Sequence, residues 1–172
     1  KRGTGGNKSL PAPEEEFGEG TSRMQIFTAG VDFTYPFTIG NQPFRFNTSW
    51  SGQWNGTPLT QQDKFSIGGR YTVRGFDGEL SLSGEKGWLW RNELGWNIAN
   101  KGHELYLGID RGKVRSSQEE LQIGDSLMGG AIGLRGKLWG INYDYFVGTP
   151  IKKPEGFRTS HVTTGFNVSY RF

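Results

Sequence analysis

Apolar and polar residues alternate along most of the chain, from Met24 to the last residue, Phe172. The C-terminal segment is the clearest case: Val162, Thr164, Phe166, Val168, Tyr170 and Phe172 alternate with Thr163, Gly165, Asn167, Ser169 and Arg171. Strict alternation over about ten residues is the pattern of a β-strand with one apolar and one polar face, and no segment offers a competing helical period. The pattern predicts seven strands, at about residues 27–37, 44–54, 88–98, 105–110, 128–138, 141–147 and 162–172.

The polar face of these strands carries arginines, glutamates and glycines, among them Arg91, Glu93 and Arg135. Such a face suits a water-filled lumen better than the outer surface of a soluble antiparallel sandwich, which would share the alternation. Aromatic residues near the predicted strand ends fit the girdles of a membrane barrel: Trp54, Trp88, Trp90, Tyr145, Tyr170 and Phe172. The pattern therefore favours an all-β fold, an antiparallel transmembrane β-barrel.

The amino-acid composition further narrows the possible classes of protein. Glycine accounts for 28 of the 172 residues, about twice its usual share of roughly 7%. The absence of cysteine excludes a disulfide scaffold, a thiolate metal site and a cysteine nucleophile. No stretch approaches the ~20 apolar residues of a spanning helix. A net charge of +3 is too small to indicate binding to nucleic acid.

The connections between the predicted strands alternate in length. Short ones lie at about residues 38–42, 99–102 and 139–140, and long ones at about 55–86, 111–126 and 148–160. Outer-membrane barrels have short periplasmic turns and long extracellular loops, so the C-terminus is predicted on the periplasmic side. The final Phe172 resembles the terminal signature of bacterial outer-membrane proteins, which implies that the barrel-assembly machinery is a partner.

An odd number of strands is unexpected, because bacterial single-chain barrels have even numbers with both termini periplasmic. Either one strand is missed, or the chain begins within an extracellular loop of a larger barrel. Residues 1–23 are rich in glycine, proline and charge and show no apolar period, which predicts a loop or disordered lead-in and favours the second option. Residues 24–172 are then the C-terminal part of the barrel.

The connection at residues 55–86 is long enough to suggest a function of its own. It contains GGRYTVRGFDGE, with Val73, Arg74, Gly75 and Phe76 at its centre. This motif resembles the loop motif of two-partner-secretion outer-membrane transporters, the TpsB family. The resemblance covers about residues 24–172. It implies a 16-stranded barrel, of which this chain holds the last seven strands, preceded by a plug helix and two periplasmic POTRA domains that are not in this chain.

In that family the loop folds back into the barrel lumen and the motif arginine contacts an acid on the wall. Gly108, Asp110 and Gly112 match the family's G-x-D wall motif, and Asp110 also has the inward parity of its strand. Glu93 has inward parity too and is an alternative partner for Arg74. A guanidinium on a fixed carboxylate would hold the loop by paired, charge-assisted hydrogen bonds. We expect Phe76 to pack against side chains of the lumen.

The resemblance implies a pore that exports an unfolded partner of the haemolysin, haemagglutinin or contact-inhibition type, in contact with outer-membrane lipids in a Gram-negative bacterium. No enzyme activity, cofactor or metal is expected, because His103 and His161 lie far apart with no matching acid and nucleophile. Two alternatives remain open. One is an assembly factor of the BamA type, and the other is a stand-alone small barrel with an eighth strand before Met24.

Overall fold

The structure, a computed structural model, describes residues 24–98, 102–116 and 123–170. Within these ranges the regular elements are β-strands and one short 3₁₀ turn, without any α-helix. None of the described residues forms a helix long and apolar enough to cross a membrane. Residues 1–23, the predicted lead-in, and Phe172, the predicted assembly signature, lie outside the described residues.

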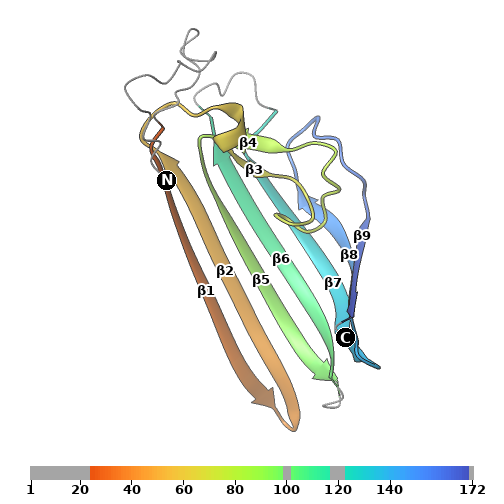
Figure 1. Ribbon diagram of the computed structural model, residues 1–172. Helices are drawn as coiled ribbons and strands as arrows, with labels where there is room; N and C mark the ends of the chain where they lie inside the picture. Colours follow the sequence, from red (N-terminus) through yellow and green to blue (C-terminus); the bar gives the residue numbers. More distant parts are fainter. Residues whose placement is uncertain (1–23, 99–101, 117–122, 171–172) are drawn as a thin grey trace.

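Seven strands form one antiparallel sheet in which neighbours in space are neighbours along the chain, once the hairpin between β2 and β5 is set aside (Figure 1). They are β1 (Ile26–Ile39), β2 (Gln42–Asn55), β5 (Lys86–Ile98), β6 (His103–Arg115), β7 (Ser126–Leu138), β8 (Ile141–Lys152) and β9 (Thr163–Tyr170). The seven predicted strands are confirmed, with β1 and β9 at the two edges.

The two faces of the sheet differ as the alternation predicts. One face is apolar and exposed, with large side chains from every strand: Phe27, Phe33, Tyr35, Trp54, Trp90, Leu107, Ile109, Ile132, Leu134, Tyr145, Phe166 and Val168. The opposite face, called the wall face below, carries charged residues, among them Glu93 and Asp110, and the glycines against which a loop packs. An uncovered apolar face of this size is what a lipid-facing surface requires.

Short connections lie at one end of the sheet and long ones at the other, as predicted (Figure 1). In the turn before β8, Trp139 and Gly140 both have left-handed backbone, with φ of 51° and 85°. Two such residues are typical of a tight type I′ hairpin turn.

Two strands run further than the apolar pattern predicts. β6 continues through Arg115 and β8 through Lys152, so the second and third long connections comprise residues 116–125 and 153–162. In β6 the apolar pattern stops earlier because Arg111 and Lys113 occupy outward positions. The backbone pairing with β5 nevertheless continues to Arg115, which pairs with Lys86. The predicted girdle also needs correction, because Trp90 and Tyr145 lie inside their strands rather than at the ends.

The connection between β2 and β5, called the inserted loop (residues 56–85), folds back against the wall face (Figure 1). It contains a 3₁₀ turn, η2 (Gln61–Asp63), and a hairpin of β3 (Phe65–Ile67) and β4 (Leu82–Gly84). The sequence pattern did not predict this hairpin, because three residues are too few to show a period.

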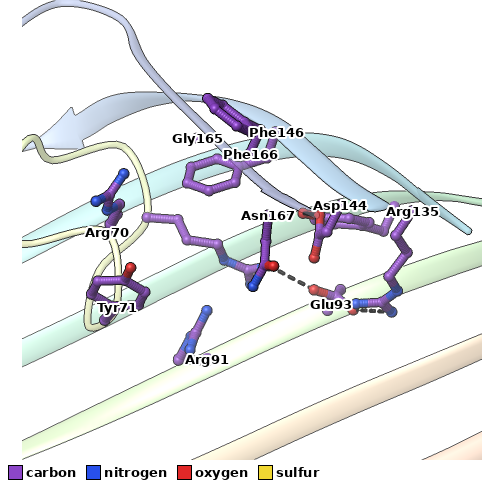
Figure 2. A pocket seen from close by; sticks show the side chains of 12 residues that line it. Arg70, Tyr71, Arg91, Glu93, Arg135, Asp144, Phe146, Gly165, Phe166 and Asn167 are labelled. Carbon is purple, nitrogen blue, oxygen red and sulfur yellow. Dashed lines mark hydrogen bonds and ion pairs between the residues drawn. The ribbon is translucent and has the colours of Figure 1, made fainter. Parts of the chain in front are cut away.

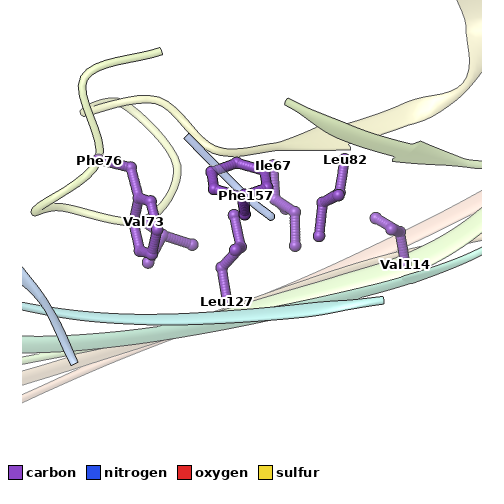
Figure 3. Close-up of a cluster of buried hydrophobic side chains, with 7 residues drawn as sticks. All are labelled: Ile67, Val73, Phe76, Leu82, Val114, Leu127 and Phe157. Carbon is purple, nitrogen blue, oxygen red and sulfur yellow. The ribbon is translucent and has the colours of Figure 1, made fainter. Parts of the chain in front are cut away.

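The hydrophobic core of the described chain lies between the inserted loop and the wall face (Figure 3). It consists of Ile67, Val73, Phe76, Leu82, Val114, Leu127 and Phe157. A soluble sandwich would instead bury one face of the large sheet under a second sheet. In the described residues the second sheet is the two-stranded β3–β4 hairpin, which is far too small for that role.

Candidate functional site

The tip of the inserted loop is a tight turn built around Thr72. The backbone nitrogens of Gly68 and Gly69 both donate to its hydroxyl oxygen at 3.1 Å, and the hydroxyl donates to the Gly69 carbonyl at 2.9 Å. The backbone nitrogen of Val73 also bonds the Gly69 carbonyl, at 3.0 Å. The turn places Val73 and Arg74 next to each other on the wall face, both buried.

Arg74 binds Asp110 of β6 in a bidentate ion pair. Its Nε lies 2.7 Å from Oδ2 and its Nη2 lies 2.8 Å from Oδ1. The backbone nitrogen of Arg74 donates to the same Oδ2 at 3.0 Å, so a single carboxylate accepts three hydrogen bonds from one residue. Asp110 is 0% exposed and Arg74 is 5% exposed. Charge-assisted, bidentate bonds of this kind fix both distance and orientation.

Glu93 of β5 binds the same arginine. Arg74 Nη1 lies 2.6 Å from Glu93 Oε2, and Arg135 of β7 holds the other oxygen of that carboxylate at 2.6 Å. The two acids that the sequence offered as alternatives therefore both contact Arg74. We call Arg74 with Asp110 and Glu93 the buried latch. Burial disfavours the charged form of Arg74, but the hydrogen bonds and charges of Asp110 and Glu93 outweigh it and raise the pKa above its ordinary value.

The residues of the wall face that lie against the latch are glycines. A Cβ on Gly108 would stand 2.5 Å from the guanidinium carbon of Arg74, and one on Gly112 would stand 3.0 Å from Ile67. Gly129 of β7, which the sequence did not single out, is tighter still, because its Cβ would overlap the carbonyl oxygen of Arg74. The two predicted glycines and Gly129 thus leave the space that the loop tip fills.

The other two motif residues, Val73 and Phe76, are fully buried. Val73 lies against Gly112 and Gly129 of the wall. Phe76 packs edge to face on Phe157, with ring centroids 5.8 Å apart and planes at 83° (Figure 3). The ring of Phe157 belongs to the connection between β8 and β9, and Phe76 also shares its buried cluster with Val114 and Leu127 of the wall strands.

Residues 1–136 match the family of haemolysin secretion/activation proteins ShlB/FhaC/HecB. The chain belongs to the ShlB/FhaC/HecB family. It is 42% identical over 156 residues to outer membrane transporter CdiB-2 of Burkholderia pseudomallei (strain 1026b), which covers 88% of this chain and 27% of that protein. It is 28% identical over 170 residues to outer membrane transporter CdiB of Dickeya dadantii (strain 3937), covering 96% of this chain and 28% of that protein.

Solved structures agree with the family assignment. CdiB from Acinetobacter baumannii superposes with a TM-score of 0.78 at 33% identity, covering 85% of this chain and 27% of that one. CdiB from Escherichia coli superposes with a TM-score of 0.84 and shares the fold at 23% identity, covering 97% of this chain and 31% of that one. The chain spans 27% and 28% of the length of the two curated relatives. The family match supports the predicted TpsB resemblance and not the BamA-type alternative.

In this member of the ShlB/FhaC/HecB family the latch belongs to a larger ionic cluster on the wall face. Glu104 binds Arg45 at 2.8 Å and also contacts Arg135. Arg91 Nε lies 3.6 Å from Asp110 Oδ2, and among the described residues that nitrogen is buried without a hydrogen bond. The sequence named Arg91 and Arg135 only as inward charges and did not connect them with the latch.

A cavity of about 260 Å³ lies beside the latch (Figure 2). Tyr106 of β6 lines it and donates its hydroxyl to Asp144 at 2.8 Å. The guanidinium groups of Arg74 and Arg135 lie over its ring, 5.9 Å and 4.8 Å from the centroid. Sequence reasoning gave Tyr106 no role, although it shares the inward parity of Asp110 and its parity alone would have placed it on the wall.

The two histidines lie away from this site. His103 Nδ1 lies 2.8 Å from the Tyr143 hydroxyl, on the apolar face, and the backbone carbonyl of His161 accepts a bond from Thr149 at 2.9 Å.

Proposed function

We propose that this chain is part of a pore through which a two-partner-secretion transporter exports an unfolded partner protein. The names of the relatives and the family match support this function. The observation that carries the proposal is the inserted loop, which is held on a polar wall by a buried ion pair. A pore that stays shut until a substrate arrives needs such an obstruction and a contact that can break.

The partner we propose is an exoprotein of the haemolysin, haemagglutinin or contact-inhibition type, and the location is the outer membrane of a Gram-negative bacterium. The exposed apolar face would contact lipid, and Phe172 would take part in recognition by the barrel-assembly machinery. The role is transport rather than catalysis, without nucleic acid or cofactor. In the complete protein the wall face would line the lumen, so the inserted loop would occupy the path of the exported chain.

The latch fits a gate because of how buried ion pairs behave. Desolvation of the two charges offsets much of their attraction, so the intact pair adds little net stability. Removing one partner, however, leaves an uncompensated buried charge and costs roughly 3–5 kcal/mol. The pair therefore fixes where the loop sits without making its release prohibitive, provided that the freed charges find other partners.

The test is Arg74→Ala in the complete protein. We expect export of the partner to fall at least tenfold, while the barrel still inserts and keeps its heat-modifiable migration. Arg70→Ala is the matched control, since Arg70 is exposed in the same loop with its guanidinium over the Tyr71 ring at 5.2 Å. Export at the wild-type rate by Arg74→Ala would contradict the role of the latch.

A further inference from the structure

The connection between β8 and β9 (residues 153–162) lies beside the tip of the inserted loop, as Figure 1 shows. Asp77 Oδ2 accepts a hydrogen bond from the backbone nitrogen of Ser160 at 2.6 Å, and the Asp77 backbone nitrogen lies 3.5 Å from the Thr159 hydroxyl. Thr163, the first residue of β9, donates its hydroxyl to the carbonyl of Gly75 at 3.2 Å. These contacts join segments more than 80 residues apart, at positions that the sequence motif did not link.

Two aromatic rings complete this contact from within. Phe157 is 2% exposed and is the buried residue of the connection, while its neighbours there are exposed or half-buried. Its ring packs on Phe76, next to Asp77 in the chain. Lys153 donates to the Phe157 carbonyl at 2.9 Å, so the connection is closed on itself around that ring. We call Asp77 with residues 157–160 the outer clasp.

The carboxylate of Asp77 is well placed to stay charged. It accepts from the Ser160 nitrogen through one oxygen and from the Glu79 nitrogen, at 3.0 Å, through the other. The Ser160 bond, opposed by partial burial and helped by the Glu79 bond, lowers the pKa of Asp77 to about 2. The clasp is therefore intact at neutral pH.

The chain between the latch and the clasp is short. Three peptide units separate Arg74 from Asp77, and an extended chain covers at most about 3.3–3.6 Å per residue. With Asp77 held, Arg74 can leave Asp110 but stays within about 10 Å of Asp77, measured between their Cα atoms. The motif therefore stays beside the connection between β8 and β9 until the clasp opens.

We propose that the outer clasp is a second, movable fastening of the inserted loop, and that Asp77 is the positioning residue that must release the 153–162 connection before the pore is clear. This inference rests on the proposed function. The outer clasp is distinct from the latch, because it gives a gating role to the connection between β8 and β9 and to a carboxylate outside the V-R-G-F sequence.

The experiment replaces the hydrogen bond between Asp77 and Ser160 by a disulfide that can be formed and broken. In the complete protein, Asp77→Cys is combined with Ser160→Cys, and export is measured after oxidation and again after reduction. A clasp that opens in each transport cycle predicts a loss of export of at least tenfold on cross-linking and full recovery with reductant. If the contact only stabilises the structure, the cross-link should leave export unchanged.

The matched control is the pair Lys113→Cys with Asp125→Cys. Their side chains form an ion pair at 2.8 Å between β6 and the 116–125 connection, outside the inserted loop. Cross-linking there should leave export unchanged. If the unsubstituted complete protein exports no partner, the proposed function fails, and this outcome is separate from a failure of the clasp.

A second measurement does not require the disulfide to form. Asp77→Ala should raise the rate at which a cysteine at position 73 is alkylated by about fivefold, whereas Glu79→Ala, with an exposed side chain two residues away, should not. An unchanged rate in Asp77→Ala would overturn the clasp. So would a cross-linked Asp77→Cys/Ser160→Cys protein that exports normally.

Discussion

The inserted loop is held at two places that differ in burial, in charge pairing and in position on the sheet. The latch is a bidentate ion pair between a 5% exposed arginine and a fully buried aspartate in the middle of the sheet. The clasp joins one half-buried carboxylate to the backbone nitrogen of Ser160, in a surface connection next to the edge strand β9. The comparison indicates a division of labour: the buried contact determines where the loop sits, and the exposed contact determines whether it can leave.

The difference in burial determines how much each contact resists breaking. Water cannot replace the partner of a buried charge until the loop has moved. The ion pairs of the latch therefore break only together with the movement of the loop. At the clasp water competes directly for the Asp77 carboxylate and for the Ser160 nitrogen. A single exposed hydrogen bond of this kind contributes only about 1 kcal/mol.

Four changes test this comparison, and the largest effect is expected for Gly129→Ala. The new methyl group would overlap the Arg74 carbonyl oxygen, and neither the strand backbone nor the loop backbone can rotate it away. We expect the tip to leave the wall, seen as near-complete alkylation of a cysteine at position 73. Gly130→Ala is the control, since its Cβ would point to the other face and its nearest neighbour would be the end of the Ile151 side chain, at 3.1 Å. Equal alkylation of the two variants would contradict the fit of the tip against the wall.

The next largest effect is expected for Asp110→Asn. It leaves Arg74 with a neutral partner at position 110 and with Glu93 as its remaining carboxylate, so the cost to the seated loop is smaller than the roughly 3–5 kcal/mol of an uncompensated buried charge. Each 1.4 kcal/mol is about a tenfold change in an equilibrium, so alkylation at position 73 should rise by about one to two orders of magnitude. Asp144→Asn, on the same face beside the same cavity but bound to Tyr106, should change the rate little. A rise of less than tenfold for Asp110→Asn would mean that the latch does not hold the tip.

A smaller effect is expected for Asp77→Asn. The amide keeps one acceptor oxygen for Ser160 or Glu79 but not for both, so we expect a two- to fivefold rise in alkylation, from about 1 kcal/mol or less. The double variant with Asp110→Asn sharpens the comparison. If the two contacts hold one tip in series, their effects will not add, and a coupling of 0.5 kcal/mol or more should appear. Strict additivity would show that they act on separate parts of the loop.

The smallest effect concerns pH. The pKa of Asp77 lies below its ordinary value, at about 2 in the folded protein. Its contribution is therefore complete above pH ~4 and is lost as the pH falls from about 4 toward 2. Spin labels at positions 71 and 139, both exposed, should report an unchanged distance between pH 7 and pH 5 in the Asp110→Asn background, where the position of the tip depends more on the clasp. A transition within that range would exclude Asp77 as its source.

The sheet could be predicted from the sequence because the alternation indicates which face meets an apolar environment. Phe27, Phe33 and Leu107 are exposed on that face. The sequence also singled out Arg74, Asp110 and Glu93, which the structure brings together. The motif resemblance identified Arg74 and Asp110, and strand parity placed Asp110 and Glu93 on the inward face.

The parts that the sequence did not predict depend on contacts between distant segments. The β3–β4 hairpin is too short to show a period, and the ring of Phe157 reaches Phe76 from a connection some 80 residues away, as the chain numbers show. Gly129 is one of 28 glycines, and its importance appears only when the loop backbone lies against it. Neither composition nor periodicity carries that information.

The ionic cluster on the wall face has a consequence for whatever passes along it. Without the loop it holds three guanidinium groups, on Arg45, Arg91 and Arg135, and three carboxylates, on Glu93, Glu104 and Asp110. The seated Arg74 adds a fourth positive charge to this set. When the loop leaves, Arg91 is already 3.6 Å from the vacated Asp110, and the six charges sum to zero. The uncovered cluster would then present equal numbers of positive and negative groups to a polypeptide that passes it.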